Sequence, residues 1–305
     1  MAVKVLITGG TGAVGLHLCE FLSERNIQVS ILSRSKNEHS KYKTYLWDHE
    51  HFLIDTKAFE NCDFIIHLAG AGIADKRWTS NRKKEILDSR VKTTSLLLKA
   101  LSKTDHKVKG IISASAVGYY GQTTSNKNFK EEDEPGKDFV ASVCQAWESE
   151  VNKFQSLGMR TVNLRIGIVL MKKGGALEKM AAPIRFNIGS ALGTGKQIVP
   201  WIHITDLNHI VLHAIQSSQM EGPYNCCAPY SVSNAELTKH IAKILGKKLW
   251  LPKVPGWVLR LILGNRAILL TEGSNVSAEK IQKTGFAYKF PKLQAALQDL
   301  LGSKE

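Results

Sequence analysis

The sequence predicts an α/β protein whose core is a doubly wound parallel sheet. Two observations predict this fold: strands and helices alternate through the first two thirds of the 305 residues, and a glycine-rich turn joins the first strand to the first helix. Such alternation is typical of parallel strands joined by right-handed helical crossovers. Strand-like apolar runs lie at residues 3–7, 28–32, 43–47, 64–68, 109–114 and 160–170, and helical patterns lie at 16–22, 80–101 and 138–157.

Local signals set several of the element boundaries. Ser80 is a candidate N-cap of the long helix, because a hydroxyl there can accept from the first free N–H groups. The polar, proline-containing stretch 121–137 is predicted to be a surface loop. Beyond residue 170 we expect a helix at 176–186, a strand-like run at 199–204, a helix capped by Thr205 or Asp206, and a helix at 234–245.

The regular alternation of strands and helices ends near residue 170, and this divides the chain into two parts. Residues 1–170 are expected to form a nucleotide-binding domain, with its sheet completed by parts of 199–230. Residues 171–305 are expected to form mainly a smaller C-terminal α/β region that binds substrate. Such a cap would lie over the carboxyl ends of the strands, where open sheets of this type bind their ligands.

The glycine turn predicts a dinucleotide site. Gly9, Gly12 and Gly15 are three residues apart, and Gly10 begins a second form of the same motif. The first glycine permits the tight turn, the middle one lets the backbone approach a pyrophosphate, and the last lets the helix pack closely on the strand. Free N–H groups at the helix N-terminus would hold the phosphates. The alternative is a glycine-rich connection that binds no ligand.

The end of the second strand predicts which dinucleotide binds. An NAD site usually places Asp or Glu here to bind the ribose 2′-hydroxyl. This chain has Ser33 and Arg34 instead, with Lys36 two residues further on. A hydroxyl and two cations suit a 2′-phosphate, which a carboxylate would repel. We therefore expect NADP rather than NAD; the alternative is that the two cations belong to a solvated loop.

The composition is basic but otherwise ordinary for a globular protein. The formal net charge is +14, yet the Lys and Arg residues are dispersed rather than gathered in a stripe with aromatic residues, so we expect no nucleic-acid partner. The five cysteines lack metal-ligand spacing, and we expect neither a metal site nor a disulfide framework. Without a signal-peptide pattern or a run of 18 apolar residues, we expect a cytoplasmic protein with no membrane partner. A homodimer is an open alternative.

Several longer motifs resemble one family. The segments GGTGAVG, CDFIIHLAGAG and SASAVGYYG resemble the extended short-chain dehydrogenases/reductases. Further matches make the chain similar to their atypical branch, the epimerase family proteins, along nearly its whole length. These matches are Gly70-Ala71-Gly72-Ile73 with Arg77-Trp78, Ile86 with Ser89-Arg90 and Thr94, Trp147-Glu148, Pro200-Trp201-Ile202-His203-Ile204 with Asp206-Leu207, and Asn225 with Pro229.

The resemblance implies a Rossmann-type NADP-binding domain, a small C-terminal substrate domain and a set of cofactor contacts. Arg90 could instead be a surface cation of the helix, and Glu85, five residues before it, need not face the same way. The implied contacts are Gly9, Gly10, Thr11, Gly12, Ala13 and Val14 for the phosphates, Ser33 and Arg34 for the 2′-phosphate, Leu68, Ala69 and Gly70 along the cofactor, and Glu85, Arg90 and Val169 on the same cleft.

The family's usual catalytic residues are incomplete in this chain. The resemblance implies a Ser after the fifth strand, which Ser115 provides, and a Tyr-x-x-x-Lys pair on the next helix. That helix reads FVASVCQAWESEV, which places Val143 and Trp147 where the pair would stand. Neither side chain can transfer a proton near neutral pH. Tyr119 or Tyr120, on the loop after Ser115, is the candidate replacement acid; packing or stacking on substrate is the alternative role.

Two other groups are weaker candidates for catalysis. Cys144 is a possible thiol nucleophile, although a buried helix cysteine is the commoner case. His203 lies in an apolar run, which favours a core histidine. The sequence therefore leaves two functions open. One is an NADP(H)-binding oxidoreductase or nucleotide-sugar-epimerase-like protein acting on a small-molecule substrate. The other is a catalytically silent NADP(H)-binding regulator or scaffold.

Overall fold

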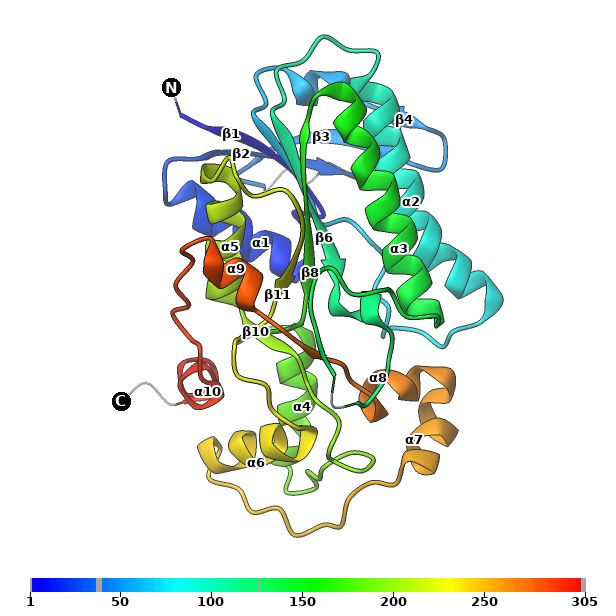
Figure 1. The fold of residues 1–305 in the computed structure, drawn as a ribbon, viewed down its shortest axis with the longest axis vertical. Coiled ribbons are helices and arrows are strands. Elements are labelled where there is room, and N and C mark those ends of the chain that lie inside the picture. Colours follow the sequence, from blue (N-terminus) through cyan, green and yellow to red (C-terminus); the bar gives the residue numbers. More distant parts are fainter. Residues whose placement is uncertain (1, 37–39, 126, 303–305) are drawn as a thin grey trace.

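A central parallel sheet organises the protein (Figure 1). The computed structural model describes residues 2–36, 40–125 and 127–302. The sheet has eight strands in the order β11-β8-β6-β5-β1-β2-β3-β4, and only β4 runs antiparallel to its neighbour. The strands are β1 (Lys4–Thr8), β2 (Gln28–Ser33), β3 (Lys43–Asp48), β4 (Leu53–Ile54), β5 (Phe64–His67), β6 (Gly110–Ala116), β8 (Arg160–Ile166) and β11 (Gly222–Cys226).

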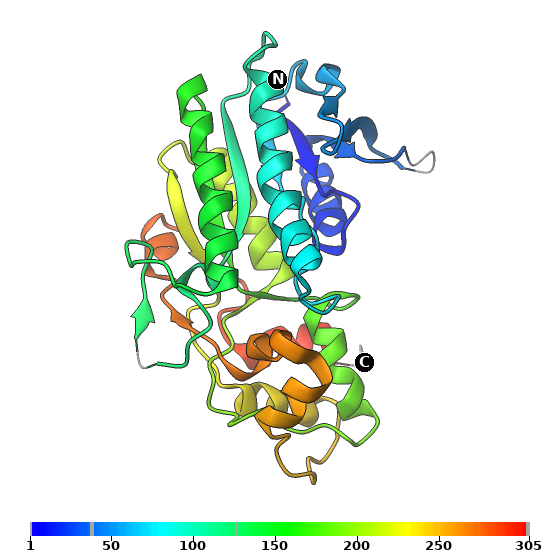
Figure 2. The ribbon, with the colours of Figure 1, turned by 90° about the vertical axis from the view of Figure 1, so that its right-hand side faces the viewer.

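Helices cover both faces of this sheet (Figures 1 and 2). Alternate residues of a strand point to opposite faces, and in β1 Ile7 joins one buried cluster while Leu6 joins the other. Both clusters are almost entirely apolar, so burial on two faces explains why these strands are continuous hydrophobic runs. The first cluster packs α1 (Ala13–Ser23) and α5 (Ile204–Gln216), and the second packs α2 (Ser80–Leu101) and α3 (Phe139–Asn152). The predicted doubly wound α/β fold is confirmed.

Several helices from the C-terminal part of the chain gather at the bottom of Figure 1. A third apolar cluster, which includes Leu177, Trp201, Leu237 and Leu297, packs the helices 175–185, 234–244 and 293–301 together. In the described part of the chain, no helix is long and apolar enough to cross a bilayer. The α-helices beyond residue 170, apart from α5, are α4 (Gly175–Arg185), α6 (Asn234–Ile244), α7 (Gly256–Leu263), α8 (Ile268–Thr271), α9 (Glu279–Lys283) and α10 (Leu293–Leu301). Two short parallel pairs lie outside the main sheet: β9 (Ile168–Leu170) with β10 (Trp201–His203), and β7 (Asn128–Phe129) with β12 (Asn275–Val276).

The expected strand at 160–170 is two strands, and this prediction was wrong. β8 ends at Ile166, the N–H of Gly167 donates to the carbonyl of Cys226 (3.0 Å), and β9 leaves the sheet to pair with β10. A Cβ on Gly167 would lie 2.6 Å from the carbonyl oxygen of Pro200, so only glycine allows these backbones to approach. The run 199–204 thus contributes a strand outside the main sheet, whereas β11 lies at its edge.

Three other local predictions also need correction. The expected surface loop 121–137 contains β7 and the buried side chain of Glu131. Thr79, not Ser80, caps α2 by accepting from the N–H of Arg82 (3.2 Å). His203, not Thr205 or Asp206, caps α5: its Nδ1 atom accepts from the N–H of Thr205 (3.1 Å), so the helix begins at Ile204.

Candidate active site

A cleft of about 500 Å³ runs along the carboxyl ends of β1, β2 and β5. Parallel sheets place the ends of neighbouring strands at one edge, and β1 and β5 flank the point where the strand order reverses, the usual ligand site of such folds. The glycine turn, the end of β2, the loop after β5 and α2 form its walls. Of the predicted cofactor contacts, the cleft brings together Gly9, Thr11, Gly12, Ser33, Arg34, Leu68, Ala69, Gly70 and Glu85.

The glycine turn is shaped to receive an anion. The N–H of Gly12 donates to the carbonyl of Gly9 (3.0 Å), which closes the turn, and Gly9 has a φ of 70° that favours glycine. A Cβ on Gly9 would lie 2.9 Å from the carbonyl carbon of Leu68. Gly12 caps α1 without a side-chain hydrogen bond, so the N–H groups of Ala13 and Val14 point out of the helix end toward the turn.

The wall of the cleft carries both cations and carboxylates. Ser33 and Arg34 lie at the end of β2 on one side, and Glu85 lies on α2 on the other. Glu85 Oε1 is 2.7 Å from Nη1 of Arg82, and this ion pair is the first cause that holds the pKa of Glu85 below its ordinary value; Arg34 adds to it. The Arg82 guanidinium also donates to the carbonyl of Gly72, which fixes the loop after β5.

Arg90 supports the cleft from behind rather than lining it. Its Nη1 donates to the carbonyls of Ala71 (3.1 Å) and Ile86 (2.9 Å), and a Cβ on Gly70 would lie 3.0 Å from its Cζ. Its guanidinium stands 5.0 Å from the ring centre of Trp147. Burial lowers the Arg90 pKa from its ordinary value. A cation therefore lies next to the tryptophan that occupies the expected lysine position.

The structure does not bring every predicted contact to the cleft wall. Gly10 has its Cα turned toward Ile31, where a Cβ would lie 3.0 Å from Cγ1. Ala13 lines a neighbouring hollow beside residues 171–174. Val169 is in β9, opposite Ile202, and packs against the first apolar cluster.

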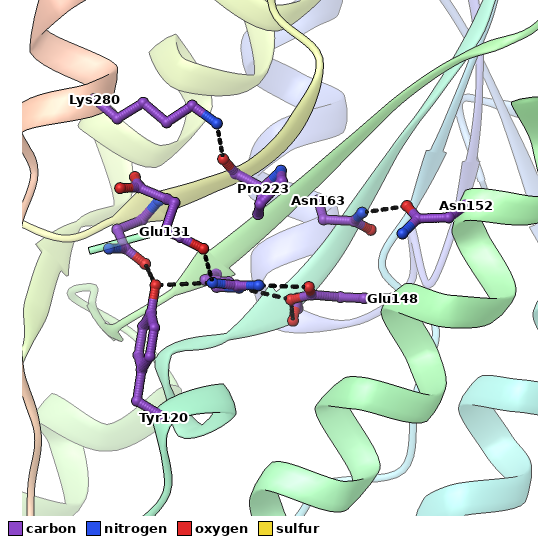
Figure 3. Close-up of polar contacts among 10 residues, drawn as sticks. Tyr120, Glu131, Glu148, Asn152, Asn163, Pro223 and Lys280 are labelled. Carbon is purple, nitrogen blue, oxygen red and sulfur yellow. Dashed lines mark hydrogen bonds and ion pairs between the residues drawn. The ribbon is translucent and has the colours of Figure 1, made fainter. Parts of the chain in front are cut away.

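A buried polar network lies at the carboxyl ends of β6, β8 and β11, and the sequence analysis missed most of it (Figure 3). Its centre is Arg165 of β8, which donates from Nε and Nη2 to the two carboxylate oxygens of Glu148 on α3, both at 2.9 Å. Nη1 donates to the hydroxyl of Tyr120 (2.9 Å) and to the carbonyl of Glu131 (3.0 Å). Ser115 donates to Oε1 of Glu148 at 2.6 Å.

The far side of the network reaches the edge strand. Tyr120 donates to Oδ1 of Asn225 in β11 (2.8 Å), and the N–H of Asn225 donates to the carboxylate of Glu131 (2.8 Å). Burial raises the pKa of Glu131. The bidentate pair of Arg165 and Glu148, both buried, satisfies two charges that would be costly alone.

Comparisons with known proteins identify the family. The sequence profile of the NAD dependent epimerase/dehydratase family matches residues 5–227, and that of a domain of unknown function, DUF1731, matches residues 254–300. The epimerase family protein SDR39U1 of Mus musculus is 35% identical over 98% of this chain and 100% of its own. YfhF of Bacillus subtilis is 34% identical over 99% of each chain.

A solved structure agrees with these matches. The crystal structure of human SDR39U1 (isoform 2) with NADPH has a TM-score of 0.88 and 33% identity, covering 98% of this chain and 99% of that one. This chain belongs to the NAD-dependent epimerase/dehydratase family. The resemblance inferred from the motifs is thereby confirmed, and the fold is the Rossmann-type fold of that family.

The helix that was expected to carry the Tyr-x-x-x-Lys pair has no ionisable side chain at either position. Val143 and Trp147 of α3 are both buried, and Trp147 packs edge-on against His67 with ring centres 6.0 Å apart. Cys144, on the same helix, is buried, and burial raises its pKa to about 12, so it is a thiol at neutral pH. His203 is also buried, and burial lowers its pKa to about 4.

The three predicted catalytic side chains differ in accessibility. Ser115 is 4% exposed and Tyr120 is 2% exposed, and the hydroxyl protons of both are directed into the network. Tyr119 is only partly buried, and its ring centre lies 3.4 Å from Cζ of Arg165. Burial raises the pKa of Tyr119 and of Tyr120, so both are neutral phenols at physiological pH. Tyr119 is thus the more accessible proton donor.

Proposed function

We propose that the protein is an NADP(H)-dependent oxidoreductase or epimerase-like enzyme that acts on a small molecule. The observation that carries the proposal is the single cleft that joins the uncapped start of α1 to Ser33 and Arg34. The relative crystallised with NADPH supports the choice of cofactor. A backbone anion cradle and a cation beside the end of β2 are the two features that a 2′-phosphorylated dinucleotide requires.

The residues present fit this cofactor. N–H groups at the start of α1 would hold the pyrophosphate, and Ser33 with Arg34 would hold the 2′-phosphate. The loop at Leu68 to Gly70 would flank the rest of the cofactor. Arg90 would hold that loop in place by donating to the carbonyl of Ala71. When bound, the nicotinamide supplies or accepts the hydride.

Proton handling would fall to Ser115 and Tyr119. The Ser115 hydroxyl donates a hydrogen bond to Glu148, so its free lone pairs can accept a hydrogen bond from a substrate hydroxyl. Tyr119 is a neutral phenol that can donate to a substrate oxygen, and the Arg165 cation beneath its ring would stabilise charge that develops on the phenol oxygen. Tyr120 would act as a positioning residue, because Arg165 and Asn225 occupy its hydroxyl.

The cofactor assignment is tested by the Arg34→Ala variant. Removing the guanidinium should weaken NADPH binding by about 1–3 kcal/mol, the range for a charge-assisted contact, and leave NADH binding nearly unchanged. Isothermal titration calorimetry with both nucleotides measures the difference. Lys103→Gln, which changes an exposed lysine after α2, is the matched control. Equal losses for both nucleotides would remove Arg34 from the 2′-phosphate site.

The catalytic assignment is tested by Ser115→Ala and Tyr119→Phe. If the protein turns over a substrate, each variant should lower kcat at least tenfold without weakening NADPH binding, because each removes one group of the proton path. Stopped-flow oxidation of NADPH measures both quantities. An unchanged kcat in both variants would contradict the assignment.

A second candidate function is a catalytically silent NADP(H)-binding regulator. The observation that favours it is the buried Val143 and Trp147 in place of an ionisable pair. This candidate predicts that NADPH binds but is not oxidised with any carbonyl substrate supplied.

A further inference from the structure

A second cavity of about 520 Å³ lies between the loop after β5 and the C-terminal helices. Asp75 lies on the wall of both this cavity and the cofactor cleft, so the two spaces share one loop. Nη1 of Arg266 donates to the carbonyl of Ala74 (2.8 Å), and Nη2 of Arg77 donates to the carbonyl of Ile262 (3.0 Å). These two bonds tie the loop to the C-terminal wall and keep the cavity beside the cleft.

The body of the cavity is apolar. Two of the helices on its wall, α4 and α6, belong to the third apolar cluster, and α8 also contributes to the wall. Pockets of this volume and lining bind small molecules through their hydrocarbon parts. The apolar side chains are Met180, Pro183 and Ile184 from α4, Leu237 and Ile241 from α6, and Leu270 from α8.

Two hydroxyls and one amide oxygen of this wall already make hydrogen bonds within the protein. Thr238 donates to the carbonyl of Asn234 (2.8 Å), the Asn234 side chain accepts from the N–H of Leu192 (2.8 Å), and Ser190 donates to the carbonyl of Pro252. A sugar ring with several hydroxyls would therefore lose its hydrogen bonds to water and gain few in return.

The charge at the cavity is positive. Lys179 and Arg266 lie on its wall, and Asp75 is the acidic residue among its described lining residues. Asp75 is 3.9 Å from Lys179, while the Arg266 guanidinium donates to backbone carbonyls. An anionic group at this edge would meet two cations and one carboxylate.

We propose that this cavity binds the substrate and that the substrate is an anionic amphiphile. Its hydrocarbon body would lie against Met180 and Leu270, and its carboxylate or other anionic group would lie beside Lys179 and Arg266. This inference rests on the proposed function, because it assumes that the ligand in the cavity is the substrate that exchanges a hydride with the cofactor. It excludes nucleotide sugars as the preferred ligands.

Calorimetric titration of the NADPH-saturated protein with sodium octanoate, 1-octanol and UDP-glucose tests the proposal. Octanoate should bind at least threefold more tightly than 1-octanol and at least tenfold more tightly than UDP-glucose. Equal binding of octanoate and 1-octanol would overturn the anionic site, and tighter binding of UDP-glucose would overturn the apolar one. Because NADPH binding is measured first, its failure would count against the proposed function instead.

Variants locate the binding in this cavity. Met180→Trp fills it and should weaken octanoate binding at least tenfold, whereas Lys179→Gln should weaken octanoate but not 1-octanol. Lys103→Gln is the control and should change neither. If Met180→Trp fails to fold, Leu270→Gln takes its place with the same expected loss. If Met180→Trp or Leu270→Gln folds and binds NADPH normally but keeps its octanoate affinity, the ligand binds elsewhere and the proposal is overturned.

Discussion

Ser115 illustrates how a familiar residue changes its role when its neighbours change. It stands where the family's serine is expected, but its hydroxyl donates a hydrogen bond to Glu148, and Arg165 holds Glu148 in place. Because the acceptor is a buried carboxylate, the serine is oriented as an acceptor toward any ligand. Ser115 is therefore one member of a hydrogen-bonded unit centred on Arg165.

The Glu148→Gln variant tests the importance of that unit for stability. It leaves the buried Arg165 without a counter-charge, so unfolding should become easier by about 3–5 kcal/mol. Asp88→Asn is the control: its cationic partner Lys92 is exposed and Asp88 is only partly buried, so the loss should be about 1 kcal/mol or less. Urea denaturation measures both, and similar losses would contradict the argument.

At the scale of elements, one glycine decides where a strand leaves the sheet. Residues 160–170 are rich in β-branched residues, and Gly167 is the local mark of a break in that pattern. The backbone of Pro200 approaches Gly167 too closely for any side chain, so the chain turns there and β9 pairs with β10. This exit carries the chain from the sheet into the C-terminal region that holds the apolar cavity.

Gly167→Ala should destabilise the fold by about 1–3 kcal/mol, the range for an overpacked site, because the new Cβ would lie 2.6 Å from the Pro200 oxygen. Gly256→Ala is the control, since its Cβ would first meet Thr271 at an ordinary 3.7 Å. Thermal and urea unfolding report the difference. If the two variants lost equal stability, the backbones at Gly167 and Pro200 would have to separate at little cost in free energy.

For the whole molecule, burial of neutral histidines links stability to pH. His67 is buried between the hydroxyls of Thr8 (2.7 Å) and Thr94 (3.0 Å), and burial lowers its pKa to about 3. The pKa of His203 falls to about 4 for the same reason. The unfolded chain therefore binds these protons near the ordinary value of 6.5, well before the folded protein does.

Stability should consequently fall as the pH falls from about 6.5 toward 4. Each histidine contributes a slope of at most about 1.4 kcal/mol per pH unit, because one proton is taken up on unfolding. Urea denaturation at pH 4.5, 5.5, 6.5 and 7.5 measures the slope. His67→Gln should lower overall stability but flatten the pH dependence; a slope as steep as that of the wild type would show that other groups cause the acid sensitivity.

The sequence by itself determined the features that depend on neighbours in the chain. The glycine turn, Ser33 and Arg34, and the alternation of strands and helices are local patterns, and the structure places the first two in one cleft as expected. Only the tertiary structure decided what surrounds Ser115. Glu148 lies 33 residues from it, and Asn225 lies 105 residues from Tyr120. Which of these side chains meet depends on the order of strands in the sheet, and no local periodicity encodes the pairing of buried charges.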